Sequence, residues 1–270
     1  MSKDSRSEID ALVEAIYASK KYAAISKDLV CAIGRRELAV RRNLKEAIKA
    51  TKNKLHQVAG AFLDARPPYE AWLEQLANVQ TSERSDLQTI CREMMRHHAS
   101  TRERLPVLVS FYRQVFRALP PIHSVLDVAC GLNPLAIPWM PLAPGATYAA
   151  CDLYADMIEF LNGFFQIAGI AGRAQVCDLV SGPPRQSADL ALVLKTLPTL
   201  DQIAKDAGRD LLRALDARYL LVSFPARSLG GRDKQMAEHY ARRFEAVVAA
   251  ERWPAERFEF ASELAFLVYK

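Results

Sequence analysis

The stretch from Ser124 to Asp152 restricts the possible folds of this chain more than any other part of the sequence. A short apolar run, 125–129, ends at Cys130-Gly131, and a second apolar run, 147–151, ends at Asp152. Short apolar runs that stop at glycine or turn residues are typical of buried parallel strands. An acid about twenty residues beyond a glycine-containing turn is placed to accept hydrogen bonds from ribose hydroxyls. The stretch indicates two core strands of an α/β domain, either alone or together with a nucleoside site.

The turn after the first of these strands, Ala129-Cys130-Gly131, favours a cofactor without phosphates. Gly131 is its only glycine and the pattern GxGxxG is absent, so the pyrophosphate of a dinucleotide has no cradle. The small residues of the turn allow close approach of the backbone to a ligand. A nucleoside cofactor such as S-adenosylmethionine fits better, with contacts expected from the turn and from Asp152-Leu153.

From residue 122 onward, strands and helices alternate, which predicts a doubly wound α/β sheet. The candidate strands are 125–129, 148–151, 174–177, 190–194, 219–223, 257–261 and 265–269, and the candidate helices are 154–167, 202–215 and 231–248. A short turn at Ser262-Glu263 joins the last two strands, so they must run antiparallel. Seven strands that end in this way are typical of Rossmann-like class I methyltransferases rather than of dehydrogenases.

Residues 1–103 give no strand signal and predict an all-helical unit. Apolar residues recur at helical spacing over 8–33, with a break at 19–24 and a stop at Gly34, and again over 35–63. Shorter helices are expected at 69–77 and 81–95. Ser100 and Glu103 have the spacing of a capping box, which predicts a further helix that continues to Leu119 with Pro106 in its first turn. We therefore expect a helical domain, 1–103, and an α/β domain, 104–270.

The excess positive charge of the chain lies in the helical unit. Residues 1–104 hold 19 Lys and Arg against 14 Asp and Glu, whereas residues 105–270 hold 17 of each. Residues 20–54 alone contain 11 basic residues and three acids. Such a cluster indicates a surface that binds a phosphate backbone or, alternatively, an ordinary solvated helix face.

The sequence also restricts the cellular compartment. From its polar amino terminus we expect no secretory signal, and no apolar run reaches the roughly 20 residues needed to span a bilayer. The five cysteines include no CxxC pair; they are Cys31, Cys91, Cys130, Cys151 and Cys177. We expect a cytoplasmic protein with reduced thiols, no metal site and no membrane association.

Two further strand ends carry polar residues, at the edge where open α/β sheets bind ligands. Asp178, within Cys177-Asp178-Leu179, can accept from an adenine amino group while Leu179 packs on the ring; alternatively it caps a helix. Lys195 follows the apolar run that ends at Leu194. A lysine there either faces a substrate or extends its stem along the apolar surface toward water.

Five segments in this order give the chain a resemblance to a known family: HHASTRERLP, DVACGLNPLA, the DLV after the third strand, LKTLPTL and FPARSLGGRDKQM. Together they resemble the aminoglycoside-resistance 16S rRNA methyltransferases of the Arm/Rmt group. The resemblance covers most of the chain. One departure is that Ala129 stands where the family more usually has glycine, which removes one flexible backbone position.

The resemblance implies roles for individual residues. Arg104, with Arg102 as a second candidate, would hold the cofactor's carboxylate, which suits a bidentate guanidinium. Asp152 would bind the ribose, Asp178 the adenine, and Lys195 would lie near the target nucleotide. The full set of implied cofactor contacts is Arg104, Arg102, Ala129, Cys130, Gly131, Asp152, Leu153, Cys177, Asp178, Leu179 and Leu194. The implied RNA contacts are Lys20, Lys21, Arg35, Arg36, Arg41, Arg42, Lys45, Lys49, Lys52, Arg227, Arg232 and Met236.

The implied reaction is methyl transfer from S-adenosylmethionine to N7 of guanine 1405 in 16S rRNA, with S-adenosylhomocysteine as product. The substrate would be the assembled 30S subunit, the protein a monomer, and the outcome resistance to aminoglycosides of the kanamycin and gentamicin type. N7 needs no general base, and a flipped target base could stack on Phe111 or Phe224. The alternatives are another decoding-site atom such as adenine N1, a small-molecule substrate, or an inactive RNA-binding module.

Overall fold

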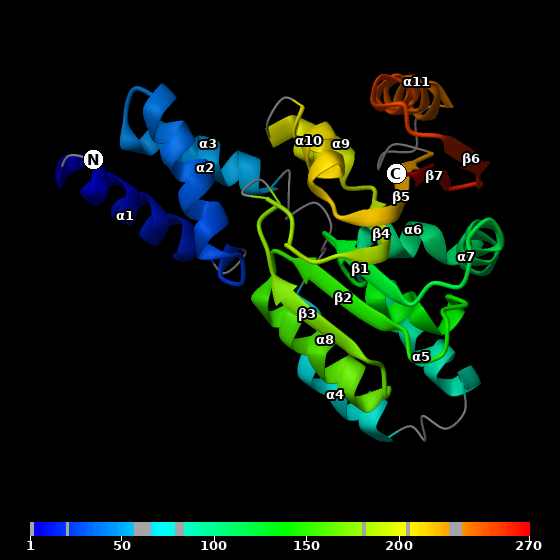
Figure 1. Ribbon diagram of the computed structural model, residues 1–270. Helices are drawn as coiled ribbons and strands as arrows, with labels where there is room; N and C mark the ends of the chain where they lie inside the picture. The colour runs from blue at the N-terminus through cyan, green and yellow to red at the C-terminus, as the bar shows by residue number, and fades with distance from the viewer. Residues whose placement is uncertain are drawn as a thin grey trace.

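The computed structural model describes residues 3–19, 22–56, 66–78, 84–179, 182–203, 206–226 and 234–270. Its centre is a seven-stranded sheet in the order β3-β2-β1-β4-β5-β7-β6 (Figure 1). Neighbouring strands are parallel from β3 to β5, whereas β7 is antiparallel to both β5 and β6. The strands are β1 (Ser124–Val128), β2 (Thr147–Asp152), β3 (Gly172–Val176), β4 (Ala188–Leu194), β5 (Ala217–Pro225), β6 (Ala255–Glu259) and β7 (Glu263–Tyr269). The predicted sheet and its antiparallel end are confirmed.

The central strands bury apolar side chains on both faces, which is why they appear as continuous apolar runs in the sequence. In β4, Leu190 and Leu192 join the core on one face of the sheet, while Ala191 and Val193 join the core on the other. Because successive side chains of a strand point to opposite faces, two cores require apolar residues at every position. The sheet is thus the middle layer of three.

Helices cover the two faces of the sheet (Figure 1). The first face packs against α4 (Tyr69–Asn78), α5 (Arg84–Met95), α7 (Leu108–Arg117) and α8 (Ala155–Ile167), and the second against α9 (Leu197–Ile203), α10 (Ala207–Ala214) and α11 (Lys234–Glu251). Tyr69 of α4 stacks on Phe160 of α8 with ring centroids 5.1 Å apart. The single helix expected over 202–215 is found as α9 and α10, and residues 204–205 lie outside the described residues.

The first three helices, α1 (Lys3–Tyr17), α2 (Lys27–Val40) and α3 (Leu44–Leu55), form a separate group at the upper left of Figure 1. The predicted break between the first two helices is confirmed, but the stop predicted at Gly34 is wrong. Gly34 is buried in the middle of α2, and a Cβ built on it would lie 2.7 Å from Leu12 Cδ2 of α1. The glycine is there for close packing between two helices, a reason that local sequence does not reveal.

The segment between α1 and α2 fastens this helical group to the α/β unit. Ser26 N donates to Leu153 O at 3.0 Å, Ala155 N donates to Ala24 O at 3.1 Å, and Ile25 forms an isolated antiparallel bridge with Tyr154. On the other side, Lys54 Nζ of α3 donates to Gln202 O of α9 at 2.9 Å. The segment directly before α2 is therefore bonded to the residues that follow β2, and α3 is bonded to α9.

The capping box predicted at Ser100 and Glu103 is not formed. The N-cap of α6 (Ala99–Arg104) is His98, two residues before the predicted Ser100, and it makes no side-chain cap bond. A 3-10 turn, η3 (Leu105–Val107), then separates α6 from α7. Pro106 lies within this turn, where its missing N–H would break the hydrogen bonding of a continuous α-helix. The expected single helix is thus divided in three.

Among the described residues, no helix combines the length and the apolar character that a membrane crossing needs.

Candidate cofactor and RNA site

The turn after β1 and the acid at the end of β2 are brought together as predicted. Gly131 N donates to Asp152 Oδ2 at 2.9 Å, and Leu153 N donates to Asp152 Oδ1 at 2.6 Å. Burial raises the pKa of Asp152, and these backbone N–H groups oppose that rise. The carboxylate holds the turn from one side, at the carboxyl edge of the parallel strands where a ribose would lie.

The alanine that departs from the family pattern adopts the conformation that glycine would favour. Ala129 has φ +50° and Gly131 has φ +52°. A left-handed alanine costs about 1 kcal/mol or more relative to glycine, because its Cβ crowds the following carbonyl. The turn therefore keeps its shape at an energetic cost that the surrounding contacts offset.

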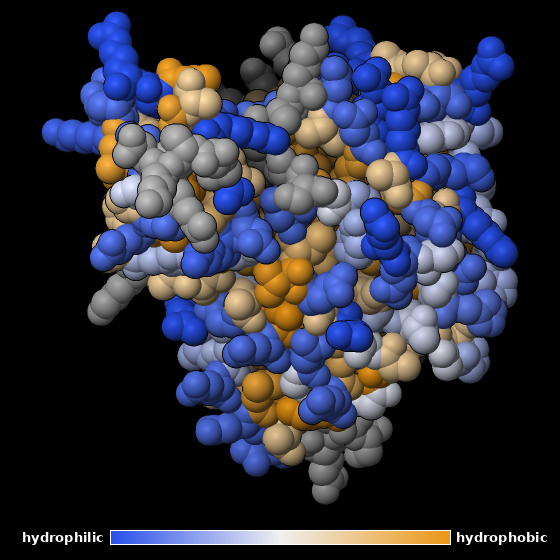
Figure 2. All heavy atoms as spheres, turned by 60° about the vertical axis from the view of Figure 1, so that its left-hand side comes forward, coloured by the Kyte–Doolittle hydropathy of each residue, from blue (hydrophilic) through white to orange (hydrophobic). Residues whose placement is uncertain are grey.

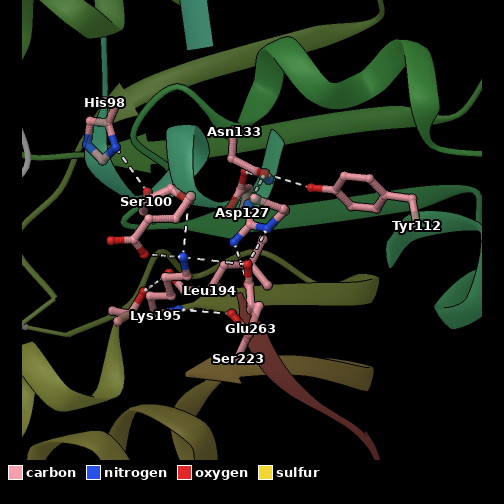
Figure 3. Close-up of polar contacts among 12 residues, drawn as sticks. His98, Ser100, Tyr112, Asp127, Asn133, Leu194, Lys195, Ser223 and Glu263 are labelled. Atoms are coloured by element: carbon pink, nitrogen blue, oxygen red, sulfur yellow. Dashed lines mark hydrogen bonds and ion pairs between the residues drawn. The ribbon is translucent and has the colours of Figure 1, made fainter. Parts of the chain in front are cut away.

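Arg104 lies in a buried cluster of polar side chains and is bonded to Asn133 and Glu263, both of which are labelled in Figure 3. Its side chain is 1% exposed, its Nε donates to Glu263 Oε2 at 2.9 Å, and its Nη2 donates to Glu263 Oε1 at 2.6 Å. Nη1 donates to Asn133 Oδ1 at 2.8 Å. A guanidinium carries five N–H groups, so these bonds occupy three of them. A planar fork that is already oriented in this way can still donate to a ligand carboxylate.

Lys195 reaches the same cluster from the end of β4. Its φ is +58°, and its Nζ lies 2.7 Å from Glu103 Oε2, 3.3 Å from Ser100 O and 3.6 Å from Glu263 Oε2. The side chain is almost entirely buried. The alternative of a lysine stem extended along the surface toward water is therefore wrong.

Glu263 connects the two cations, and sequence reasoning missed it. The sequence pattern places it in the turn between the last two strands, whereas it is the first residue of β7, paired with Pro225 of β5, and its side chain is 0% exposed. Burial alone would raise the pKa of Glu263, but Arg104 and Lys195 hold that pKa below its usual range. A charged residue at the start of the apolar run LAFLVY was the only available signal.

A second buried carboxyl, Asp127 of β1, lies behind this cluster. Its Oδ2 accepts from Tyr148 OH at 2.6 Å and from Asn133 Nδ2 at 2.9 Å, while Tyr112 OH donates to Asn133 Oδ1 at 2.6 Å. Among the described residues, Asp127 Oδ1 has no hydrogen-bond partner. Burial raises the pKa of Asp127 to about 6, although the bonds from Tyr148 and Asn133 and the charge of Arg104 oppose this rise.

The remaining predicted cofactor residues lie at or near the same edge of the sheet. Cys177 N donates to Asp152 O at 2.9 Å, which places the Cys177-Asp178-Leu179 segment beside Asp152. Asp178 is buried. Leu194 is buried directly before Lys195. Arg102 is exposed and donates from Nη1 to Arg96 O at 3.3 Å.

The basic residues of α2 and α3 lie on the surface. Figure 2 turns the left-hand side of Figure 1 toward the viewer and shows hydrophilic side chains over much of this face. The residues of this set that are wholly or partly exposed are Arg35, Arg36, Arg41, Arg42, Lys45, Lys49 and Lys52. Arg41 is paired with Glu37 at 2.8 Å. Lys20, Lys21, Arg227 and Arg232 lie outside the described residues.

Three other predicted contacts fall around the second face of the sheet or in the core. Met236 of α11 lines a hollow of about 430 Å³ between α9, α10 and α11, which does not include the turn after β1. Phe111 is buried with Arg104 Cζ 5.0 Å from its ring centroid, and Phe224 is buried and stacked on Tyr240 at 5.3 Å. Both aromatic rings are core residues, so the suggestion that one of them stacks on a target base is wrong.

The described residues contain no group of three or more His, Cys, Asp or Glu side chains that could hold a metal ion.

The strand order, the antiparallel β7 and the acid at the end of β2 bonded to the first turn define a class I methyltransferase of the Rossmann-like type. The chain matches the family model described as "Ribosomal RNA methyltransferase (FmrO)" over residues 18–269, and it belongs to that family.

Individual relatives agree with this assignment. A 16S rRNA (guanine(1405)-N(7))-methyltransferase of Frankia casuarinae is 41% identical over 96% of this chain and 93% of its own length. A protein of the same name from Micromonospora echinospora is 36% identical over 97% of each chain. The crystal structure of the 16S rRNA methyltransferase RmtF in complex with S-adenosyl-L-homocysteine is similar, with a TM-score of 0.83 and 32% identity over 100% of this chain and 99% of that one.

Replacement of Glu263 tests the buried cluster. Glu263→Gln keeps the shape of the side chain but removes the counter-ion that Arg104 and Lys195 share. We expect the free energy of unfolding to fall by about 3–5 kcal/mol, because breaking a buried ion pair leaves an uncompensated charge. Urea denaturation measures the change. The control is Glu245→Gln, whose partner Arg257 is near the surface; a surface pair contributes about 1 kcal/mol or less. Equal effects of the two substitutions would contradict this account.

Asp127 makes a distinct contribution to the pH dependence of stability. Because its pKa is about 6 in the folded protein and 3.8 for an ordinary aspartic acid in water, the folded state binds this proton more tightly than the unfolded state. Its contribution to stability is therefore present below about pH 4 and is lost as the pH rises toward 6, by up to about 3 kcal/mol. Asp127→Asn removes this titration. The difference in unfolding free energy, variant minus wild type, should increase between about pH 4 and 7; a constant difference would argue against a protonated Asp127.

Proposed function

We propose that this protein transfers a methyl group from S-adenosylmethionine to N7 of guanine 1405 of 16S rRNA in the 30S subunit, and thereby gives resistance to aminoglycosides of the kanamycin and gentamicin type. The proposal rests mainly on one observation. The turn that is bonded to Asp152 and the buried ion pairs of Arg104, Glu263 and Lys195 lie at the same edge of the sheet. Relatives with this named activity match nearly the whole chain, including its basic helices, which supports the same substrate here.

The residues present fit the cofactor. Asp152 would accept from the ribose hydroxyls, Asp178 from the adenine amino group, and Arg104 would donate to the carboxylate of the methionine part. The buried Asp127 Oδ1, which lacks a partner among the described residues, is an acceptor of the kind that a cationic ligand can satisfy. When bound, S-adenosylmethionine supplies an electrophilic methyl group on a sulfonium.

The protein itself needs to do little acid–base chemistry. Guanine N7 carries a free lone pair, so no side chain has to remove a proton before the methyl group is transferred. Lys195 is held by Glu103 and Glu263, and its role would be to position the target nucleotide. Correct placement of two reactants can lower a barrier by about 7–11 kcal/mol.

Access to N7 requires the RNA to change shape. N7 lies on the major-groove edge of guanine. The major groove of A-form RNA is deep and narrow, so side chains cannot reach N7 in a stacked base. We therefore infer that the target base is flipped out of its stack, at a cost of a few kcal/mol. The exposed cations of α2 and α3 would supply the docking energy by contacting phosphates of the assembled subunit, with one protein monomer per subunit.

Methyl incorporation into 30S subunits tests the activity. Purified protein, labelled S-adenosylmethionine and 30S subunits should give one methyl group per 16S rRNA, mapped to N7 of guanine 1405 by mass spectrometry. Expression should also permit growth in kanamycin or gentamicin. Methylation of adenine N1, or of naked rRNA in preference to the subunit, would overturn the stated target or substrate.

Two substitutions serve as controls in the same assay. Asp152→Asn should weaken cofactor binding, because the carboxylate that accepts from Gly131 loses its charge. Lys195→Met keeps the aliphatic stem and removes the charge, and it should lower the turnover number while the cofactor dissociation constant stays near that of the wild type. If calorimetry showed weaker cofactor binding for Lys195→Met and unchanged binding for Asp152→Asn, the roles given to these two residues would be wrong.

The basic surface of α2 and α3 should determine the salt dependence of docking. Replacing the pair Arg35 and Arg36 by Gln should weaken 30S binding and reduce the slope of log K against log salt by roughly 0.7–0.9 for each phosphate that the variant no longer neutralises. A control pair on the opposite half of the molecule is Arg242 and Arg243 of α11. An unchanged slope in the α2 variant would show that these basic residues form an ordinary solvated helix face that does not bind RNA.

A further inference from the structure

The imidazole of His98 lies against the Cα of Gly131, whose N–H donates to the Asp152 carboxylate. A Cβ built on Gly131 would lie 2.6 Å from His98 Cε1, 2.8 Å from Nε2 and 3.0 Å from Nδ1. Comparable distances to all three atoms mean that the ring presents its face to this position. His98 is the N-cap residue of α6, and its side chain is buried. The ring therefore fills the space that any larger residue at 131 would need.

His98 is itself held in place by its surroundings. Its Nδ1 is in hydrogen-bond contact with Ser100 Oγ at 2.9 Å, and Figure 3 shows the ring beside the residues that surround Lys195. The pKa of His98 is lowered to about 3, mainly by burial and further by the positive charges of Lys195, Arg104 and Arg102. The ring is therefore neutral at physiological pH, and a neutral ring does not repel a cationic cofactor.

We propose that His98 is a positioning residue of the cofactor site, which fixes the turn 129–131 by packing its imidazole against Gly131. This rests on the proposed function only in so far as the turn binds S-adenosylmethionine. Gly131 is then held by two contacts, the bond from its N–H to Asp152 Oδ2 and the packing of the imidazole against its Cα. Without the ring, the turn could move away from Asp152, and the cofactor would meet a less well-defined surface.

The turn itself offers an internal comparison. Ala129 adopts φ +50° two residues before Gly131, so alanine is compatible with a left-handed conformation in this turn. Alanine at 131 should then be excluded mainly by the imidazole rather than by the backbone. If so, removing the imidazole should make alanine at 131 more acceptable, which separates a specific contact from a general loss of stability.

A double-mutant cycle on cofactor affinity tests the proposal. The dissociation constant of S-adenosylhomocysteine is measured by calorimetry for the wild type, His98→Ala, Gly131→Ala and the double variant. We expect each single substitution to weaken binding, on the order of tenfold or more, and the double variant to bind more tightly than Gly131→Ala alone. If the fold-change in the dissociation constant of the double variant equals the product of the two single fold-changes, His98 and Gly131 act independently and the proposal is overturned.

A more conservative variant keeps the test usable if His98→Ala does not fold. His98→Asn keeps a polar group near Ser100 but lacks the ring atoms that lie nearest to the Gly131 position, so it should give the same cycle even if His98→Ala does not fold. Binding of 30S subunits without cofactor should be unchanged in each folded variant. A protein that binds S-adenosylhomocysteine but methylates no 30S subunit would contradict the proposed function and leave this cycle valid. A wild type that does not bind this ligand would overturn both.

Discussion

The buried ion pair between Arg104 and Glu263 is the contact on which the rest of the site depends. It joins α6, which follows the helical part of the chain, to β7, the last strand, over 159 residues of sequence. Removing both charges from water is costly, and only the two-bond geometry, with further bonds to Asn133 and Lys195, offsets that cost. A buried pair of this kind is a poor source of stability but a precise way to fix positions. Its presence at the cofactor edge is therefore better explained by function than by folding.

The polar residues of this edge form one connected system. Asn133 accepts from Arg104 and Tyr112 and donates to Asp127, so the side chain that sits below the first turn also orients the arginine. Glu263 continues the system to Lys195. Apart from Asp127 Oδ1, the hydrogen bonds and ion pairs of this system limit the number of side-chain arrangements that the buried region can adopt. A methyl transfer that relies on placement rather than on proton transfer needs this kind of rigidity.

Features that depend on local pattern could be predicted from the sequence, whereas those that depend on distant contacts could not. The seven strands are predictable because burial on both faces produces continuous apolar runs. Asp152 is predictable because its spacing from the first turn is fixed by the βα unit. Gly34 is misleading because a packing glycine and a helix stop look identical until Leu12 is seen against it. Glu263 and His98 escape prediction because their partners lie far away in the sequence.

Backbone strain at this edge points to the same conclusion as the buried charges. Ala129 and Lys195, at the ends of β1 and β4, are two of the residues other than glycine with positive φ among those that the structure describes. Such conformations cost of order 1–3 kcal/mol each and persist only where the surroundings determine them. Lys195 is held by its N–H, which donates to Ser223 O at 2.9 Å, and by its ion pairs. In return, the left-handed turn directs the side chain back toward Glu103 and Glu263 instead of along the strand. Part of the backbone strain of the described residues thus lies at the edge that holds the buried ion pairs, and the apolar core on both faces of the sheet offsets it.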